Sequence, residues 1–339
     1  MKLGYGLISC QRVAGDDRDW TQLYREALDL TRLSEQVGID SVWTTEHHFV
    51  DDGYMPSLLV TSAAMAAVTE RIAIGTGVVL APLHDPIRLA EDAATVDLIS
   101  EGRLVLGLGL GWSDIEFTAF GADRSRRGKA MDEILTILRA AWSGEPIDHH
   151  GEIYDLPTVG VRPTPDRSIP IWIGGGADAA LRRAALLADG FFSNAAASDL
   201  THQIGVVQEE RDRLGVERDF QWTHYQYVYV TDDVAAGWDA IMPHIHHSRW
   251  KYADMGPSAH RPAGPVAAPP PLNPSEEDRL RSMVVVGPPE AIAEHITATA
   301  RAAGTPIDVV ARAHYPAMSF GEQSEQIHRL AEEVKPLLG

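Results

Sequence analysis

Residues 71–112 of the chain read RIAIGTGVVLAPLHDPIRLAEDAATVDLISEGRLVLGLGLGW. The segment 71–80 is rich in β-branched residues, which predicts a buried strand. Asp85-Pro86 predicts the start of a helix that ends before Gly102, because proline fits the first helical position and glycine commonly follows the last. The apolar run 104–108 predicts a second strand. A strand, a helix and a strand in this order are typical of a parallel sheet.

The same alternation continues in both directions along the chain. Strands are predicted over 2–9, 41–45, 71–80, 104–108, 169–173, 190–193, 225–230 and 307–311. Helices are predicted over 20–37, 58–68, 86–100, 131–142, 177–187 and 200–214, and from Ser319, with a small hairpin over 147–161. Eight strand-then-helix units favour a closed (β/α)8 TIM barrel with loop insertions. An open doubly wound sheet is the alternative.

One segment interrupts this rhythm. Residues 256–278 contain seven of the 21 prolines, which excludes a helix or a central strand there on sequence grounds. We interpret the segment as a Pro-rich insertion into a single barrel domain that spans 1–339, and as a lid that is mobile without ligand. The residues just before it, 244–252 (HIHHSRWKY), could line the mouth of a pocket.

Composition narrows the classes of partner. The formal net charge of −19 opposes binding to nucleic acid or to an anionic membrane surface. The single cysteine, Cys10, allows no disulfide within the chain, which fits a reducing compartment. We find no apolar run long enough to cross a bilayer and no targeting signal in residues 1–9, so we expect a cytoplasmic protein.

The first stretch that suggests chemistry is Trp43-Thr44-Thr45-Glu46-His47-His48-Phe49, in which Glu46, His47 and His48 directly follow the strand predicted over 41–45. In a parallel barrel the active site lies at the carboxyl ends of the strands. A carboxylate beside two histidines can exchange protons near neutral pH. A solvated loop is an equally good interpretation of the histidine pair alone. We expect no metal site, because no third ligand lies at metal spacing.

Three glycine-rich stretches lie at the ends of other predicted strands. In 75–78 (GTGV) and 107–112 (GLGLGW), small residues at neighbouring strand ends leave room for a flat ligand, although tight barrel packing explains them equally well. In 171–177 (IWIGGGA), a strand enters three glycines and a helix start, which suits a phosphate or a plain turn. Together the three stretches predict a planar ring over glycines with its phosphate at a late helix start, which is a flavin-phosphate layout.

The chain resembles the bacterial-luciferase-like monooxygenase family. The resemblance runs from the start to about Gly190 and returns in 284–296 and the last helix. It is most specific in 42–49 (VWTTEHHF), 74–112, 116–121 (EFTAFG) and 170–176 (PIWIGGG). It implies a (β/α)8 barrel, reduced FMN or the related deazaflavin coenzyme F420, and usually a homodimer. Members that use FMN receive it reduced from a separate flavin reductase and react it with O2.

The resemblance also implies roles for individual positions. His47 matches the catalytic histidine and Glu46 lies at the flavin site, whereas Gly77-Val78 lies near the flavin ring, often with a cis peptide. Gly109 stands where the luciferases carry a cysteine, and Gly176-Ala177 where they bind phosphate through a Glu-Ser pair. Phosphate contacts are therefore expected from backbone N–H groups of Gly174, Gly175, Gly176 and Ala177, from Ser193, and from an arginine within 124–127, of which we choose Arg127.

Three functions are consistent with these residues. The leading hypothesis is a monooxygenase that uses reduced FMN and O2 to oxygenate a small organic substrate. The second is a deazaflavin-dependent hydride-transfer oxidoreductase, which would not use O2. The third is a non-catalytic flavin-binding protein, which the Glu-His-His stretch disfavours because storage needs no proton-exchanging residue.

Overall fold

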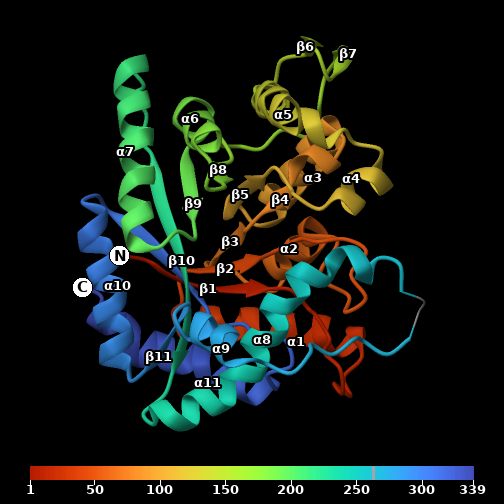
Figure 1. Cartoon of the computed structure of the whole chain (residues 1–339). Coiled ribbons are helices and arrows are strands. Elements are labelled where there is room, and N and C mark those ends of the chain that lie inside the picture. The colour runs from red at the N-terminus through yellow and green to blue at the C-terminus, as the bar shows by residue number, and fades with distance from the viewer. Residues whose placement is uncertain (262–263) are drawn as a thin grey trace.

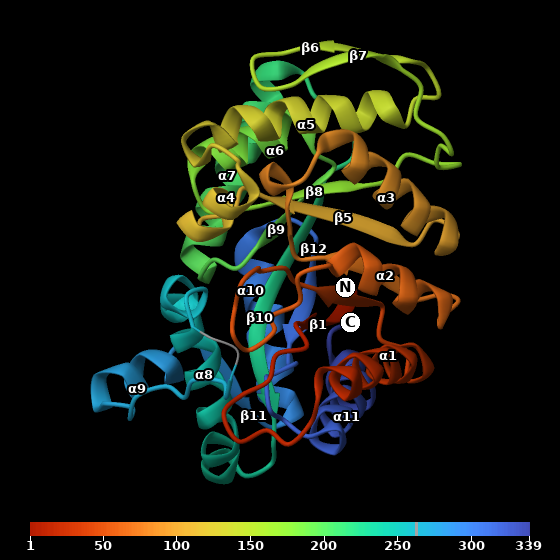
Figure 2. The same ribbon diagram turned by 90° about the vertical axis from the view of Figure 1, so that its right-hand side faces the viewer.

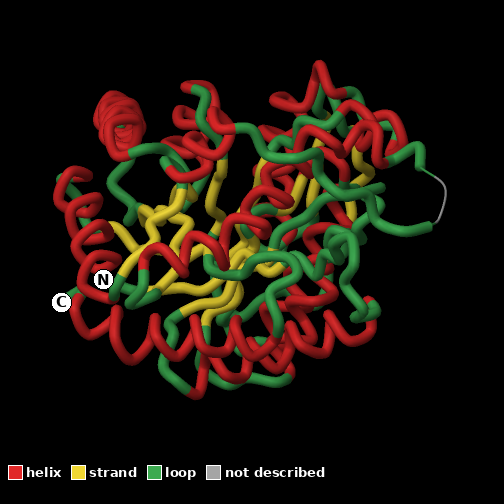
Figure 3. The backbone as a smooth tube through the Cα atoms, turned by 60° about the horizontal axis from the view of Figure 1, so that its bottom comes forward, coloured by secondary structure: helices red, strands yellow, loops and turns green. Residues whose placement is uncertain are grey.

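A closed ring of eight parallel strands forms the centre of the molecule. The computed structural model describes residues 1–261 and 264–339. In ring order the strands are β1 (Leu3–Ile8), β2 (Ser41–Thr44), β3 (Ala73–Thr76), β5 (Leu104–Gly109), β8 (Ile171–Gly174), β9 (Gly190–Ser193), β10 (Gln221–Val230) and β12 (Ile307–Arg312), which pairs with β1 again. Figure 3 shows these strands gathered inside a layer of helices. The predicted (β/α)8 barrel is confirmed, and the open sheet is excluded.

Helices cover the outside of the barrel (Figure 1). They are α1 (Trp20–Gln36), α2 (Leu58–Ala67), α3 (Pro86–Ile99), α4 (Asp114–Phe120), α5 (Arg127–Ala141), α6 (Asp178–Leu187), α7 (Ala197–Leu214), α8 (Val234–Ser258), α9 (Pro274–Arg281), α10 (Pro289–Ala303) and α11 (Phe320–Arg329). Asp85 caps α3 with Pro86 at its first position, and Ser319 opens α11 with the expected capping box. Among the described residues, no helix is both long and apolar enough to span a membrane. The antiparallel hairpin β6 (Ile147–His150) and β7 (Asp155–Val159) is also as predicted.

The predicted strand over 71–80 is divided in the structure. β3 ends at Thr76, and β4 (Val79–Leu80) continues after the Gly77–Val78 peptide, which is cis. β4 pairs with the carboxyl end of β5, where Val79 lies opposite Leu108. The apolar, β-branched composition of 71–80 is the same on both sides of the break. Composition therefore predicted one strand where there are two.

A ninth parallel strand, β11 (Val284–Gly287), lies outside the ring and was not predicted, and neither was α10 after it. The long strand β10 pairs with β9 through 221–224 and with β11 through 227–230. Its other side pairs with β12 throughout 222–227. On the edge of β10 that pairs with β9 and β11, Tyr225 and Gln226 therefore have no strand partner among the described residues. One cavity of the protein is lined by these two residues.

The segment 256–278 differs from the sequence expectation at both ends. α8 continues to Ser258 and holds Pro257 in its last turn, whereas α9 begins at Pro274. Proline is tolerated at Pro274 because the first N–H of a helix has no intrahelical partner. The prediction that this segment excludes helix is therefore wrong at its edges. Figure 2 shows α8 and α9 together on one side of the barrel; residues 262–263 of the insertion lie outside the described residues.

A buried ion-pair cluster ties α8 to the loop after β2. The Lys251 side chain is 1% exposed, and its Nζ lies 2.7 Å from Asp51 Oδ1 and 3.0 Å from Asp254 Oδ2. Arg261 contacts the same two carboxylates. Removing one member of such a cluster leaves an uncompensated charge and is strongly destabilising. The entry to the insertion is therefore fastened to the barrel.

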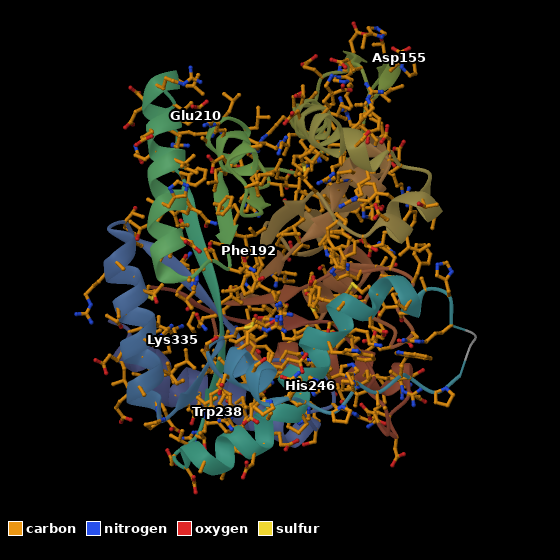
Figure 4. All side chains as sticks on the ribbon, viewed as in Figure 1. Asp155, Phe192, Glu210, Trp238, His246 and Lys335 are labelled. Carbon is orange, nitrogen blue, oxygen red and sulfur yellow. The ribbon has the colours of Figure 1, made fainter. Side chains whose placement is uncertain are left out.

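Aromatic side chains fill the barrel interior. Trp43 stacks on Trp172 and Phe192, with ring centroids 5.3 and 4.7 Å away, and Figure 4 shows Phe192 near the middle of the molecule. Glycines on the two strands beside β2 make this possible. A Cβ at Gly75 would lie 2.4 Å from the Trp43 ring, and one at Gly6 would lie 2.9 Å from Trp43 Cβ. For Gly75, packing is therefore the correct interpretation, and no flat ligand is needed to explain it.

We predict that Gly75→Ala lowers the free energy of unfolding by about 2 kcal/mol or more, because the added methyl overpacks the enclosed Trp43 ring. Gly205→Ala is the matched control, since nothing lies within 4 Å of a Cβ there and alanine is favoured by about 0.5–1 kcal/mol in a helix interior. Denaturant midpoints of the two variants test the difference. A Gly75→Ala protein as stable as the parent would contradict this account of the barrel core.

Candidate active site

A cavity of about 350 Å³ opens at the carboxyl ends of the barrel strands. It is lined by Thr45, Glu46, His47, Gly77, Val78, Leu80, Gly109, Leu110, Gly111, Trp112, Arg127, Gly174, Gly175, Gly176, Ala177, Ala180, Phe192, Asn194, Tyr225 and Tyr252. Of the residues predicted for the site, only Ser193 is not in this lining. The structure thus brings together stretches that lie more than 100 residues apart in the sequence.

A second, larger cavity of about 640 Å³ lies at the opposite end of the barrel. Its lining includes Lys2, Asp40 and Asp308 at the amino ends of the strands, with Trp43 and Trp172 between the two cavities. Residues at this end of a TIM barrel serve stability, whereas catalytic groups lie at the carboxyl end. We therefore assign the chemistry to the smaller cavity, where His47 and the glycines converge.

His47 is oriented by a buried carboxylate that the sequence analysis did not single out. Its Nδ1 lies 3.0 Å from Glu116 Oε1, and the same oxygen accepts a hydrogen bond of 2.8 Å from the backbone N–H of His48. Glu116, on α4, is only 1% exposed. A carboxylate bonded to Nδ1 fixes the tautomer and leaves Nε2 for a second partner. Glu116 lies in the EFTAFG motif, so the resemblance had pointed to its position without giving it a role.

The charge of Glu116 also affects the protonation of His47. Burial by itself lowers the pKa of His47, but the hydrogen bond to Glu116 and nearby negative charge raise it above its usual value. Because the ordinary histidine pKa lies near ~6.5, a raised pKa favours the protonated ring close to neutral pH. The pair of His47 and Glu116 can therefore serve as a proton-exchanging unit at the wall of the cavity.

Glu46 is held differently from Glu116. Its Oε2 accepts a hydrogen bond of 2.6 Å from the backbone N–H of Leu80, and its Oε1 lies 3.1 Å from His84 Nε2 and 3.2 Å from His48 Nε2. Burial opposes its ionisation, but the two histidines lower the pKa of Glu46 to about 2. Because this carboxylate stays charged and both of its oxygens have partners, it holds β4 and the two histidines in place. This geometry favours a positioning role over proton exchange.

Three aromatic rings surround His47. The rings of Tyr54, Tyr252 and Trp112 meet its imidazole edge-on, at centroid distances of 4.9, 5.5 and 6.0 Å. Tyr252 comes from α8, within the 244–252 stretch expected at the pocket mouth, but no sequence pattern distinguishes it from its neighbours. Because these rings exclude water, they strengthen the electrostatic interactions of His47.

Tyr252 is unusual among the buried tyrosines. Burial by itself raises the pKa of its phenol, but the positive charges of Arg312 and His47 and its hydrogen bonds lower the pKa well below 10. The hydroxyl lies 3.4 Å from that of Tyr54. Tyr252 is therefore a second group in the cavity whose proton is held weakly.

The remaining wall of the cavity fits a planar group that carries a phosphate. Gly77 and Gly109 line the cavity, but a Cβ there would lie 2.9 Å from Phe192 and 2.4 Å from Val78, so packing explains these glycines as it explains Gly75, whereas Gly176 faces open space. Arg127, at the start of α5, lines this end, and its buried Nε has no hydrogen-bond partner within the described chain. The first turn of α6 has no side-chain cap, so its N–H groups can donate hydrogen bonds to an anion.

Ser193 lies at the end of β9 but its hydroxyl is already engaged. Its Oγ lies 2.7 Å from Gln203 Oε1 and accepts a hydrogen bond of 3.1 Å from the backbone N–H of Ala195. Both contacts order the loop before α7. In this arrangement the hydroxyl does not face the cavity, unlike the groups at Arg127 and Gly176.

Comparisons with known proteins identify the family of this chain. A family model described as luciferase-like monooxygenase matches residues 1–306. The oxygenase component of flavin-dependent trigonelline monooxygenase from Acinetobacter baylyi is 32% identical over 170 residues, which cover 49% of this chain and 47% of that protein. F420-dependent glucose-6-phosphate dehydrogenase from Microbacterium testaceum is 31% identical over 174 residues, covering 50% and 52%. The match thus spans about half the length of these curated relatives.

Solved structures share the fold over the whole chain. Monooxygenase RslO1 from Streptomyces bottropensis superposes with a TM-score of 0.85 at 22% identity, with both chains fully covered. The oxygenating constituent of 3,6-diketocamphane monooxygenase from Pseudomonas putida, solved in complex with FMN, gives 0.78 at 19% identity, with 99% and 98% covered. At these identities the likeness establishes the barrel and not the substrate.

We predict that Glu116→Gln lowers the pKa of His47, because the charged acceptor that stabilises the imidazolium is lost. In the parent the raised pKa means that this interaction stabilises the fold fully below pH ~6.5 and is lost as the pH rises through the folded-state value. The stability deficit of Glu116→Gln should therefore be largest in acid and shrink with rising pH. Histidine NMR titration and unfolding at several pH values measure both, with the exposed Glu290→Gln as control. An unchanged His47 titration would contradict the pairing.

Proposed function

The chain belongs to the luciferase-like monooxygenase family, and from this premise we propose that it is a monooxygenase that uses reduced FMN and O2 to oxygenate a small organic substrate. The observation that carries the proposal is the composition of one cavity. A glycine-lined slot with the unpartnered Arg127 Nε lies at one end, and His47 with its buried carboxylate lies at the other. A flavin needs both a phosphate contact and a ring-binding slot, and oxygenation needs a proton-exchanging group nearby.

Each group of residues has a separate role in the proposed reaction. Reduced FMN, when bound, supplies the electrons that activate O2. Arg127 and the N–H groups at Gly174–Ala177 hold the phosphate, and Gly77, Val78 and Gly109 contact the ring. The aromatic rings around His47 exclude water, and His47 gives or takes a proton at Nε2 while Glu116 holds Nδ1. Glu46 keeps β4 and the Gly77–Val78 peptide in place through Leu80.

Two partners follow from the proposed chemistry. One similar protein is the oxygenase component of a trigonelline monooxygenase, a name that implies a second component. We propose that a separate flavin reductase supplies reduced FMN to this chain and that the chain acts as a homodimer.

The second candidate is hydride transfer with the deazaflavin coenzyme F420. It is favoured by the 31% identity to an F420-dependent dehydrogenase, and the same slot and phosphate contacts suit either ring system. In that reaction His47 would exchange the proton of a substrate hydroxyl, and O2 would not be consumed. A non-catalytic flavin carrier would not require the pair of His47 and Glu116.

Equilibrium titration with FMN, reduced FMN, riboflavin and F420 distinguishes these proposals. We expect reduced FMN to bind most tightly and to support substrate-dependent O2 consumption. Arg127→Gln should weaken FMN at least ~10-fold, the typical value of a hydrogen bond to a charged group, and leave riboflavin unchanged because it has no phosphate. Tighter binding of F420 without O2 uptake would establish the second candidate. Failure of all four to bind would refute both.

We further predict that His47→Ala binds flavin almost normally but loses at least ~100-fold in turnover, as expected for a positioned acid–base group. His48→Ala is the matched control. Its ring points toward Glu46 and away from the cavity, as expected for adjacent side chains at a strand end. Steady-state rates and flavin titrations decide between them. If His48→Ala is the more damaging change, the assignment of the catalytic histidine is wrong.

A further inference from the structure

A separate cavity of about 300 Å³ adjoins the proposed flavin site, and Asn194 and Tyr225 line both. It lies at the interruption in the barrel wall, where β10 changes its partner from β9 to β11. Its other lining residues are Ala195, Ala196, His224, Gln226, Tyr227, Arg249, Ser282, Met283, Val285, His295, Thr299 and Arg312. The two cavities therefore share a wall at Asn194 and Tyr225.

The charge of this cavity is the reverse of that of the whole protein. The chain carries 48 acidic and 29 basic residues, yet the lining holds two arginines and no carboxylate. Burial lowers the pKa of His224 and of His295, which keeps both rings neutral at physiological pH. The net charge of the lining is thus positive. Such a cavity attracts anions in a protein whose surface repels them.

Arg312 is a buried cation whose partners among the described residues are tyrosines, one of which, Tyr252, shares a side-chain hydrogen bond with it. It ends β12, is 8% exposed, and lies over the rings of Tyr227 and Tyr225 at 4.4 and 5.6 Å. Within residues 1–261 and 264–339 it forms no ion pair with an acidic side chain, in contrast to Arg18, which pairs with Asp16 and Glu26. Ring faces stabilise a guanidinium but do not saturate its five N–H donors. An unpaired buried charge is costly unless a partner arrives.

The side chains of Tyr227 and Arg249 line the cavity together with Arg312. Tyr227 is 6% exposed, and its hydroxyl interacts with the Arg249 side chain. Arg249, on α8, lies over the Tyr252 ring at 5.6 Å and, like Arg312, has no acidic partner in the part of the chain that the structure describes. A guanidinium carries only donors and a positive charge, so the two arginines suit an anionic acceptor.

We propose that Arg312 and Arg249 bind the anionic group, a carboxylate or phosphate, of the organic substrate. This inference rests on the proposed function, since it names the substrate class of that site. With its anion between the two arginines, a substrate reaches past Tyr225 and Tyr252 toward His47. The reacting end then lies at the flavin slot, and the charged end lies in the side cavity.

The test uses a pair of ligands of the same shape. Benzoate and benzamide are titrated into the full chain without cofactor, by calorimetry. Benzoate should bind at least tenfold more tightly than benzamide. Arg312→Gln and Arg249→Gln should each remove most of this preference and leave benzamide unchanged, and Arg312→Lys should restore part of it. Arg249→Gln keeps the test valid if Arg312→Gln does not fold.

Three outcomes would overturn the proposal. Equal affinities for benzoate and benzamide would show that the cavity does not select an anion. Retention of benzoate preference in both glutamine variants would show that the arginines act only in packing. Loss of benzoate binding in Arg127→Gln, or loss of FMN binding but not riboflavin binding in Arg312→Gln, would assign the anion to the cofactor phosphate. Failure of the flavin function itself is read separately, from the flavin titrations of the parent.

Discussion

The indole of Trp43 occupies the middle of the barrel, and the site above it depends on that packing. Glycines on the adjacent strands make room for the ring, and Trp172 and Phe192 complete the stack. Gly77 takes part in both regions, because it lies against Phe192 below and lines the cavity above. The floor of the site is therefore the upper surface of the barrel core, and its position is set by apolar contacts that do not tolerate added atoms.

Two carboxylates then give the histidines after β2 different surroundings. Glu116 holds His47 toward the cavity, and Glu46 gathers His48 and His84 on the other side. His47 and His48 are adjacent in one short loop, but each contacts a different carboxylate. The difference comes from neighbours that are far away in the sequence: Glu116 lies on α4, and His84 follows β4.

The sequence predicted the ring of eight strands because each strand is short, apolar and followed by a helix. It predicted most of the cavity because glycines and histidines stand directly after strands. Other features depend on contacts that no local pattern encodes. The break at Gly77–Val78, the pairing of β11 with β10 and the partners of Arg312 all arise from tertiary packing. Glu116 and Tyr252 lie in stretches that had been noticed, but only the fold shows that they meet His47.

The site has two structural parts, one from the barrel strands and one from α8. The ion-pair cluster around Lys251 attaches α8 to the barrel. The glycine-lined wall belongs to the barrel strands, whereas Tyr252 and Arg249 come from α8, which contacts the loop after β2 through Lys251, Ser258 and Tyr252. A lineage could exchange the α8–α9 segment, and with it the shape and charge offered to substrates, without rebuilding the barrel. The architecture is in this sense modular, and selection can diversify specificity while the inherited redox chemistry is conserved.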